Sequence, residues 1–179
     1  MKPVTGTRFT VADYERLPEG MPIELVEAQF VKMPAPEPYH AGIPGELAWA
    51  LLEHLGAVGR ARVLASPVDL YVDDENVFQP DLLVLPEGER VRKGMRRVPV
   101  PVLVAEVLSP STAARDRGAK RRGYRRAGVC ELWLLDPEAE TVEVHDFPAD
   151  RVERTGRDGT ATSRAVPGFA VPVASLFPN

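Results

Sequence analysis

The sequence contains a single cysteine, Cys130, among its 179 residues. One thiol cannot form an internal disulfide, so the chain does not belong to the class of small secreted domains held together by disulfides. Cys130 lies in an apolar-leaning stretch, residues 128–135, where we expect it to pack as a small hydrophobic side chain. A reducing cytosol suits such a protein.

Long hydrophobic runs are also missing. No stretch reaches the roughly 20 apolar residues that a membrane-spanning helix needs, and residues 1–8 contain no apolar run of the signal-peptide kind. Histidines number only three, and no cysteine or second histidine stands at ligand spacing from His40, which argues against a zinc site. We therefore expect a soluble cytoplasmic protein with no membrane partner.

The composition that remains is that of a globular protein, with 44% apolar and 27% charged residues, so wholesale disorder is not expected. A chain of 179 residues fits one domain and buries a core without help from disulfides or structural metals. We expect a single domain, 1–179, whose core runs from about residue 9 to residue 177.

The basic residues are unevenly distributed. The net charge is −4, which argues against nonspecific coating of nucleic acid. Of the 22 Lys and Arg residues, however, five lie within residues 90–97 and seven within residues 115–126. Two local basic patches therefore persist in an acidic chain, and a subset of them is expected to face nucleic-acid phosphate. The candidates are Arg97, Arg115, Arg117 and Arg121.

Apolar periodicity, turn residues and helix caps divide the chain into alternating elements. The expected helices are residues 10–17, 41–55 and about 112–127, with Pro44 in the first turn of the second helix and Gly128 as the left-handed cap of the third. The expected strands are residues 23–26, 29–33, 62–65, 68–72, 82–85, 102–108, 131–135 and 141–145, with short strands in 151–177 and a turn at 73–76. This order predicts a mixed α/β fold, a central sheet flanked by helices with extra N-terminal and C-terminal β-hairpins.

One carboxylate interrupts the most apolar of these strands. Glu106 shares one face of the strand with Val104 and Leu108. A buried ionised carboxylate needs an ion pair, hydrogen bonds or a metal ion. Asp81 opens the preceding strand, so antiparallel or neighbouring pairing of the two strands would place the two carboxylates close together. Two convergent carboxylates suit Mg²⁺ (or Mn²⁺), which takes one or two of them together with water and substrate phosphate.

These residues belong to a longer pattern that resembles the Uma2 family, which is similar to the PD-(D/E)xK restriction-endonuclease-like superfamily. The resemblance covers roughly Phe9 to Phe177, and its most specific motif is the stretch 106–112. The residues that carry it are Pro80-Asp81, Glu106-Val107-Leu108-Ser109-Pro110-Ser111-Thr112, Asp116, Lys120, Tyr124, Gly128-Val129, Glu131, Trp133 and Asp136-Pro137, with Glu24-Leu25-Val26, His40 and Pro167-Gly168-Phe169 fitting as well.

The resemblance implies a restriction-endonuclease-like fold and a metal-dependent nuclease that hydrolyses phosphodiester bonds, with DNA as substrate. Asp81, Glu106 and Lys120 would be its catalytic residues, with Asp81 and Glu106 as metal ligands. Apart from the resemblance, Glu46 lies at the edge of the apolar face of the helix expected over 41–55 and is a candidate for a further metal ligand or a residue that orients a ligand. The superfamily's strand lysine would stand two residues after the acid, where this chain has Leu108. In the Uma2 pattern a helix lysine takes that role, and Lys120 occupies the matching place, orienting water or stabilising phosphorane charge.

Other interpretations stay open at this stage. Glu106 and Lys120 also fit a buried structural ion pair, and Asp116 and Lys120 fit an i,i+4 ion pair on a helix surface. His40 precedes a helix and fits either a cap or a substrate contact. For the protein as a whole, there are two alternatives to a nuclease. One is a catalytically silent module that binds nucleic acid or protein, and the other is a homo-oligomeric scaffold whose strands pair between subunits.

Overall fold

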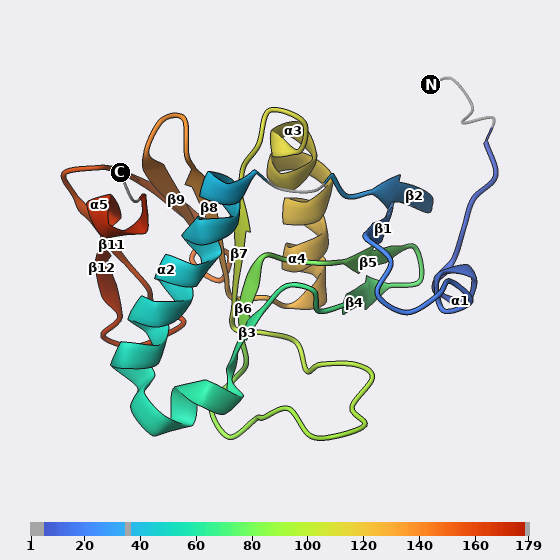
Figure 1. Cartoon of the computed structure of the whole chain (residues 1–179), viewed down its shortest axis with the longest axis horizontal. Coiled ribbons are helices and arrows are strands. Elements are labelled where there is room, and N and C mark those ends of the chain that lie inside the picture. The colour runs from blue at the N-terminus through green and yellow to red at the C-terminus, as the bar shows by residue number, and fades with distance from the viewer. Residues whose placement is uncertain (1–5, 35–36, 178–179) are drawn as a thin grey trace.

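A computed structural model describes residues 6–34 and 37–177 of the chain (Figure 1). The helices are α1 (Val11–Tyr14), α2 (Pro38–Leu55), the 3-10 helix η1 (Gly56–Ala61), α3 (Ala113–Arg115), the π-helix η2 (Asp116–Lys120), α4 (Arg121–Ala127) and α5 (Val173–Leu176). The strands are β1 (Ile23–Val26), β2 (Gln29–Lys32), β3 (Val63–Ala65), β4 (Leu70–Asp73), β5 (Asn76–Phe78), β6 (Leu82–Val84), β7 (Leu103–Val107), β8 (Glu131–Asp136), β9 (Thr141–Asp146), β10 (Arg151–Gly156), β11 (Thr160–Thr162) and β12 (Ala170–Pro172). No helix in these described ranges is long and apolar enough to cross a membrane.

The main sheet is mixed and has the strand order β10-β9-β8-β7-β6-β3. Strands β7 and β8 are parallel and joined by the α3–α4 crossover, whereas the other neighbours in this sheet are antiparallel. Because successive side chains of a strand point to opposite faces, β7 contributes to two cores. Leu103, Ala105 and Val107 pack on the side of α2, and Val104 packs on the side of α4 (Figure 1).

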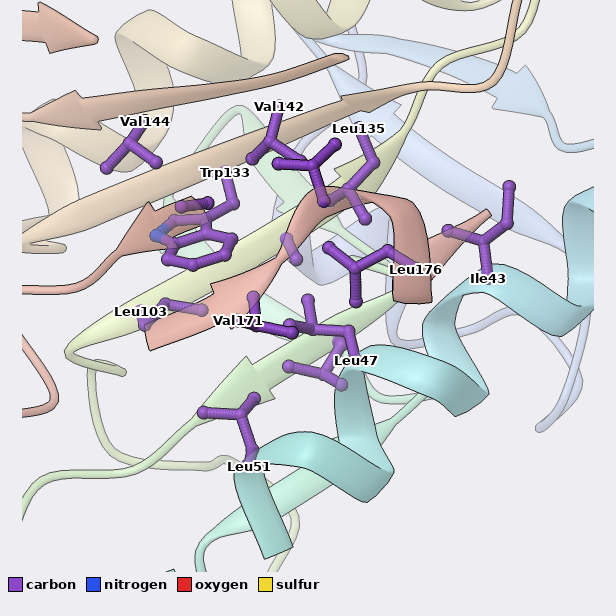
Figure 2. Packing of buried hydrophobic residues seen from close by; sticks show 14 of the residues in the cluster. Ile43, Leu47, Leu51, Leu103, Trp133, Leu135, Val142, Val144, Val171 and Leu176 are labelled. Carbon is purple, nitrogen blue, oxygen red and sulfur yellow. The ribbon is translucent and has the colours of Figure 1, made fainter. Parts of the chain in front are cut away.

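The α2 side of the sheet is mainly apolar, although the buried carboxylate of Glu131 lies there beside Trp133. Figure 2 shows Ile43, Leu47 and Leu51 of α2 directed into one cluster, which also holds Leu103, Trp133 and Leu176. These side chains recur along α2 at helical spacing, which is why one stripe of the helix is buried. The closing segment, with β12 and α5, covers the rest of this core.

A second sheet, in the order β2-β1-β5-β4, lies beside the α4 face of the main sheet (Figure 1). The expected hairpins at both ends of the chain are confirmed as β1–β2 and β11–β12. Strand β5 was not predicted, because three residues are too few to show alternation. The turn at 73–76 therefore leads from β4 into β5 and not into the strand that begins at Leu82.

Two helix predictions need correction. Helix α2 begins at Pro38 and not near Ala41, so Pro44 lies inside the helix and not in its first turn. The helix expected over about 112–127 is divided by the π-helix η2, whose wider turn was not visible in the apolar pattern. Its end was predicted correctly, since Gly128 has a φ of 89° and caps α4 in the left-handed conformation.

Candidate active site

Asp81 and Glu106 are neighbours across two antiparallel strands. Strand β6 pairs with β7 in the register Leu82↔Ala105, and Asp81 precedes Leu82 as Glu106 follows Ala105. The backbone N–H of Val107 donates to Oδ2 of Asp81 at 2.7 Å, which fixes the orientation of that carboxylate. The antiparallel pairing expected from the sequence therefore does bring the two acids together.

Lys120 is enclosed by carboxylates. Its side chain is 1% exposed, and its Nζ lies 2.6 Å from Oε1 of Glu106, 2.8 Å from Oε1 of Glu24 and 3.7 Å from Oδ1 of Asp116. The hydroxyl of Tyr124 donates to the same Oε1 of Glu106. Lys120 thus reaches the site and also forms a buried ion pair. Asp116 is buried as well, so the surface ion pair considered from the sequence is wrong.

Glu24 is a member of this cluster that the sequence interpretation did not single out. It lies on β1, in the second sheet, with no exposed surface. Its Oε1 also accepts the backbone N–H of Gln79 at 2.8 Å, while its Oε2 has no hydrogen bond and lies 3.7 Å from Nε of Arg115. The signal was present, because Glu24 is an acid in a short apolar strand, as Glu106 is.

The cluster holds an excess of negative charge in a dry environment. Burial raises the pKa of Glu106 well above its ordinary value, and the nearby carboxylates raise it further, although the Lys120 ammonium opposes this. Burial likewise raises the pKa of Asp81 and that of Asp116. Burial alone would lower the pKa of Lys120, but Glu106, Glu24 and Asp116 more than reverse this and raise it. Lys120 therefore stays charged, and its acidic neighbours favour a proton or a cation.

Two carboxylate oxygens remain for a metal ion. Lys120 and Tyr124 both contact Oε1 of Glu106, and the Val107 N–H uses Oδ2 of Asp81. Within the described ranges, the other oxygen of each carboxylate, Oε2 of Glu106 and Oδ1 of Asp81, has neither a hydrogen bond nor an ion pair. Nowhere in these ranges do three or more His, Cys, Asp or Glu residues form a group that could hold a metal ion. The donor set therefore fits a cation that needs only two protein oxygens and takes the rest from water and substrate, as Mg²⁺ does.

Glu46 does not join the cluster. It is exposed on α2, and among the described residues no ion pair or hydrogen bond connects its carboxylate to Asp81 or Glu106. His40, at the start of α2, does reach the site, since its Nε2 lies 2.9 Å from the carbonyl oxygen of Val107. A carbonyl only accepts, so Nε2 carries the hydrogen. His40 therefore fixes the end of β7 next to Asp81.

Intramolecular partners already engage three of the four arginines expected to contact phosphate. Arg97 pairs with a glutamate at 2.8 Å, Arg115 lies 3.7 Å from buried Glu24, and Arg117 pairs with two carboxylates of β8 and β9. Arg121 has no ion pair within the described ranges. Nucleic-acid contact by these four residues stays a prediction.

Helix α4 packs closely against Phe78 next to the site, because Tyr124 contacts both Phe78 and Glu106. Tyr124 meets the Phe78 ring edge-to-face, with ring centroids 5.2 Å apart, and the neighbouring Gly123 leaves room for that ring. A Cβ at Gly123 would lie 2.5 Å from Cε2 of Phe78. Because Phe78 is fully buried, it has nowhere to move.

We expect Gly123→Ala to destabilise the protein by about 1–3 kcal/mol through overpacking, even though alanine favours a helix by about 1 kcal/mol over glycine. Urea unfolding measures this difference. Gly45→Ala is the matched control, because a Cβ at Gly45 of α2 meets nothing within 4 Å, and this variant should be slightly more stable than wild type. A Gly123→Ala protein as stable as the control would contradict the packing argument.

Comparison with known proteins places this geometry in a family. A family model for Uma2, described as "Putative restriction endonuclease", matches residues 11–174. A crystal structure described as a putative nuclease belonging to DUF820, from Anabaena variabilis, superposes with a TM-score of 0.79 at 20% identity, covering 94% of this chain and 97% of that one. At this identity the likeness shows a shared fold alone.

An uncharacterized protein of Synechocystis sp. is 33% identical over 113 residues, which are 63% of this chain and 58% of that protein. The matched region thus spans little more than half the length of that relative. The family model, in contrast, spans both sheets and every residue of the acidic cluster. The chain belongs to the Uma2 family.

Proposed function

We propose that this protein is a metal-dependent nuclease that hydrolyses phosphodiester bonds of DNA at Asp81 and Glu106. Its membership of a restriction-endonuclease-like family supports the general class of activity. The observation that carries the proposal is the pair of carboxylates on adjacent strands, each with one oxygen engaged by the protein and one left for a ligand.

The charge balance of the cluster supports a divalent cation. Four carboxylates share the cluster with one ammonium and one guanidinium, so two negative charges lack a counterion when all four acids are ionised. Unpaired buried charge is costly, and a single Mg²⁺ or Mn²⁺ would remove the deficit. The residues involved are Glu24, Asp81, Glu106, Asp116, Lys120 and Arg115.

In this proposal each residue of the chain has a defined task. Asp81 and Glu106 hold the cation, which when bound lowers the pKa of a water molecule and neutralises phosphate charge. The Val107 N–H orients Asp81. Lys120 orients Glu106 through Oε1 and is almost fully buried, so it acts as a positioning residue and does not itself meet the phosphate.

Calorimetric titration with Mn²⁺ or Mg²⁺ tests the metal site without requiring knowledge of the substrate. We expect wild type to bind and both Asp81→Ala and Glu106→Gln to lose binding, at least about tenfold, because each removes one of two protein ligands. Glu46→Gln and the equally exposed Glu53→Gln are controls and should bind as wild type does. Binding should weaken as the pH falls, since the raised pKa values of both ligands let protons compete.

A second titration in the presence of a non-hydrolysable phosphorothioate duplex covers sites that complete their metal shell with phosphate. No metal binding up to millimolar concentration in either titration would overturn the nuclease proposal. The silent binding module would then lead, since Leu108 stands where the superfamily has its lysine and Lys120 is enclosed. A homo-oligomer and a cytoplasmic location stay predictions.

A further inference from the structure

Basic side chains crowd the loop between β6 and β7, residues 85–102. Asp81 immediately precedes β6 and Glu106 lies near the end of β7, so both acids lie at the same end of this antiparallel strand pair. The loop joins the two strands at the other end. Figure 1 shows it in yellow-green at the end of the sheet away from α3. The candidate active site therefore makes no use of this loop.

Four cations in this loop are free of ion pairs with any described residue. All residues from Glu87 to Arg97 are exposed, and the only acids among them are Glu87 and Glu89. The segment therefore carries net positive charge in a chain whose total is −4. The four free cations are Arg90, Arg92, Lys93 and Arg96.

The arginines of α4 provide the contrast. Arg122 pairs with Glu27 at 2.8 Å, Arg125 with Asp150 at 2.8 Å and Arg126 with Asp73 at 3.0 Å. These side chains are also about half exposed, so exposure alone does not explain why the loop cations are unpaired. Within the described parts of the chain, the fold supplies an acid to three of the four arginines of α4, whereas in the loop only Arg97 has one, Glu15.

The loop holds its cations in a defined arrangement. The N–H of Met95 donates to the carbonyl of Arg92 at 3.1 Å, closing a tight turn in which Gly94 has a φ of 82°. Beyond this turn, Arg97 lies 4.2 Å above the Tyr71 ring and Val98 packs into the α4-side core. The turn therefore presents Arg92 and Lys93 on an anchored segment.

We propose that this loop binds the phosphate backbone of double-stranded DNA. Guanidinium groups match phosphate oxygens in geometry and charge, and three of the four free cations are arginines. An anionic lipid surface is less well matched, because the exposed apolar residues of the loop, Val91, Met95 and Val100, do not lie on an amphipathic helix. The inference rests on the proposed function for its choice of DNA as the polyanion.

Fluorescence anisotropy with a labelled 30-base-pair duplex in EDTA tests the inference, because no metal is present and no cleavage occurs. The loop variant carries Arg90→Gln, Arg92→Gln and Arg96→Gln. The control carries Arg122→Gln, Arg125→Gln and Arg126→Gln, which removes the same charge from paired positions. We expect the loop variant to lose affinity at least about tenfold and to lower the slope of log K against log salt by about 3, with the control within about twofold of wild type.

The inference is overturned if the loop variant and the control lose affinity equally, or if wild type does not bind the duplex. Wild-type binding to vesicles containing phosphatidylserine, in place of DNA, would assign the loop to a lipid surface and also overturn it. The outcome is separable from the nuclease proposal: loop-dependent binding without any hydrolysis on adding Mn²⁺ would leave this inference standing while the nuclease fails. Hydrolysis that is unaffected by the loop variant would support the nuclease proposal and overturn this inference.

Discussion

Replacing Lys120 with methionine is expected to destabilise the protein by about 3–5 kcal/mol. The substitution keeps a long side chain but leaves Glu24, Glu106 and Asp116 in the core without their shared ammonium. Removing one partner of a buried ion pair costs more than the pair itself contributes, because the remaining charges cannot be rehydrated. Urea unfolding monitored by tryptophan fluorescence measures the change, because Trp133 is buried in the folded protein.

A matched control for this variant is Arg122→Met, which removes an exposed cation from its pair with Glu27 and should cost at most about 1 kcal/mol. The double variant Glu24→Gln with Lys120→Met should cost less than the sum of the two single changes, since it removes a charge that Lys120 had neutralised. Strict additivity, or a Lys120→Met protein as stable as wild type, would show that the ammonium does not hold the cluster together.

The Lys120 result also bears on how catalysis is tested. Comparing the activity of wild type and Lys120→Ala would confuse lost turnover with lost folding, because the lysine is almost fully buried. Asp81→Ala and Glu106→Gln are better probes. Each leaves the ammonium with at least two carboxylate neighbours.

Glu131→Ala is expected to destabilise the protein by about 3–5 kcal/mol while leaving the metal site intact. The carboxylate of Glu131 is buried and accepts four hydrogen bonds, at Oε2 from Nε1 of Trp133 (3.1 Å) and Oγ of Ser163 (2.7 Å), and at Oε1 from the N–H groups of Arg164 (2.6 Å) and Ala165 (3.2 Å). Truncation leaves these donors without an acceptor, and their losses do not simply add.

Urea unfolding of Glu131→Ala gives the stability change, with the exposed Glu138→Ala as a control that should differ from wild type by less than about 0.5 kcal/mol. Calorimetry on the folded Glu131→Ala protein at low temperature should show the metal affinity of wild type, because the contacts of Glu131 lie on β8 and the 160s segment and not at Asp81. Loss of metal binding in a folded variant would contradict this separation.

The two predictions divide the Uma2 pattern into parts with different tasks. Glu131 and Trp133 tie the closing segment to β8, so their place in the pattern is explained by folding. Asp81 and Glu106 each keep one free oxygen at a strand end, where the proposed metal ion would bind. Lys120 and Tyr124 serve both folding and the site, because they contact Oε1 of Glu106 while they are buried on the α4 side of the sheet, and Asp116 pairs with Lys120.

The sequence alone predicted the fold class, most of the strands and the proximity of Asp81 and Glu106. The order of apolar segments and turns predicted the fold class. The acid within the apolar strand 102–108, together with Asp81 at the start of the preceding strand, predicted the proximity. Tertiary structure decided what local pattern does not encode. Glu24 comes from another sheet, Glu46 is turned to solvent, and a π-helix directs both Asp116 and Lys120 inward. The tertiary structure also decided which arginines are neutralised, because the ion pairs of arginines join residues up to 95 positions apart. At this range sequence spacing carries no information.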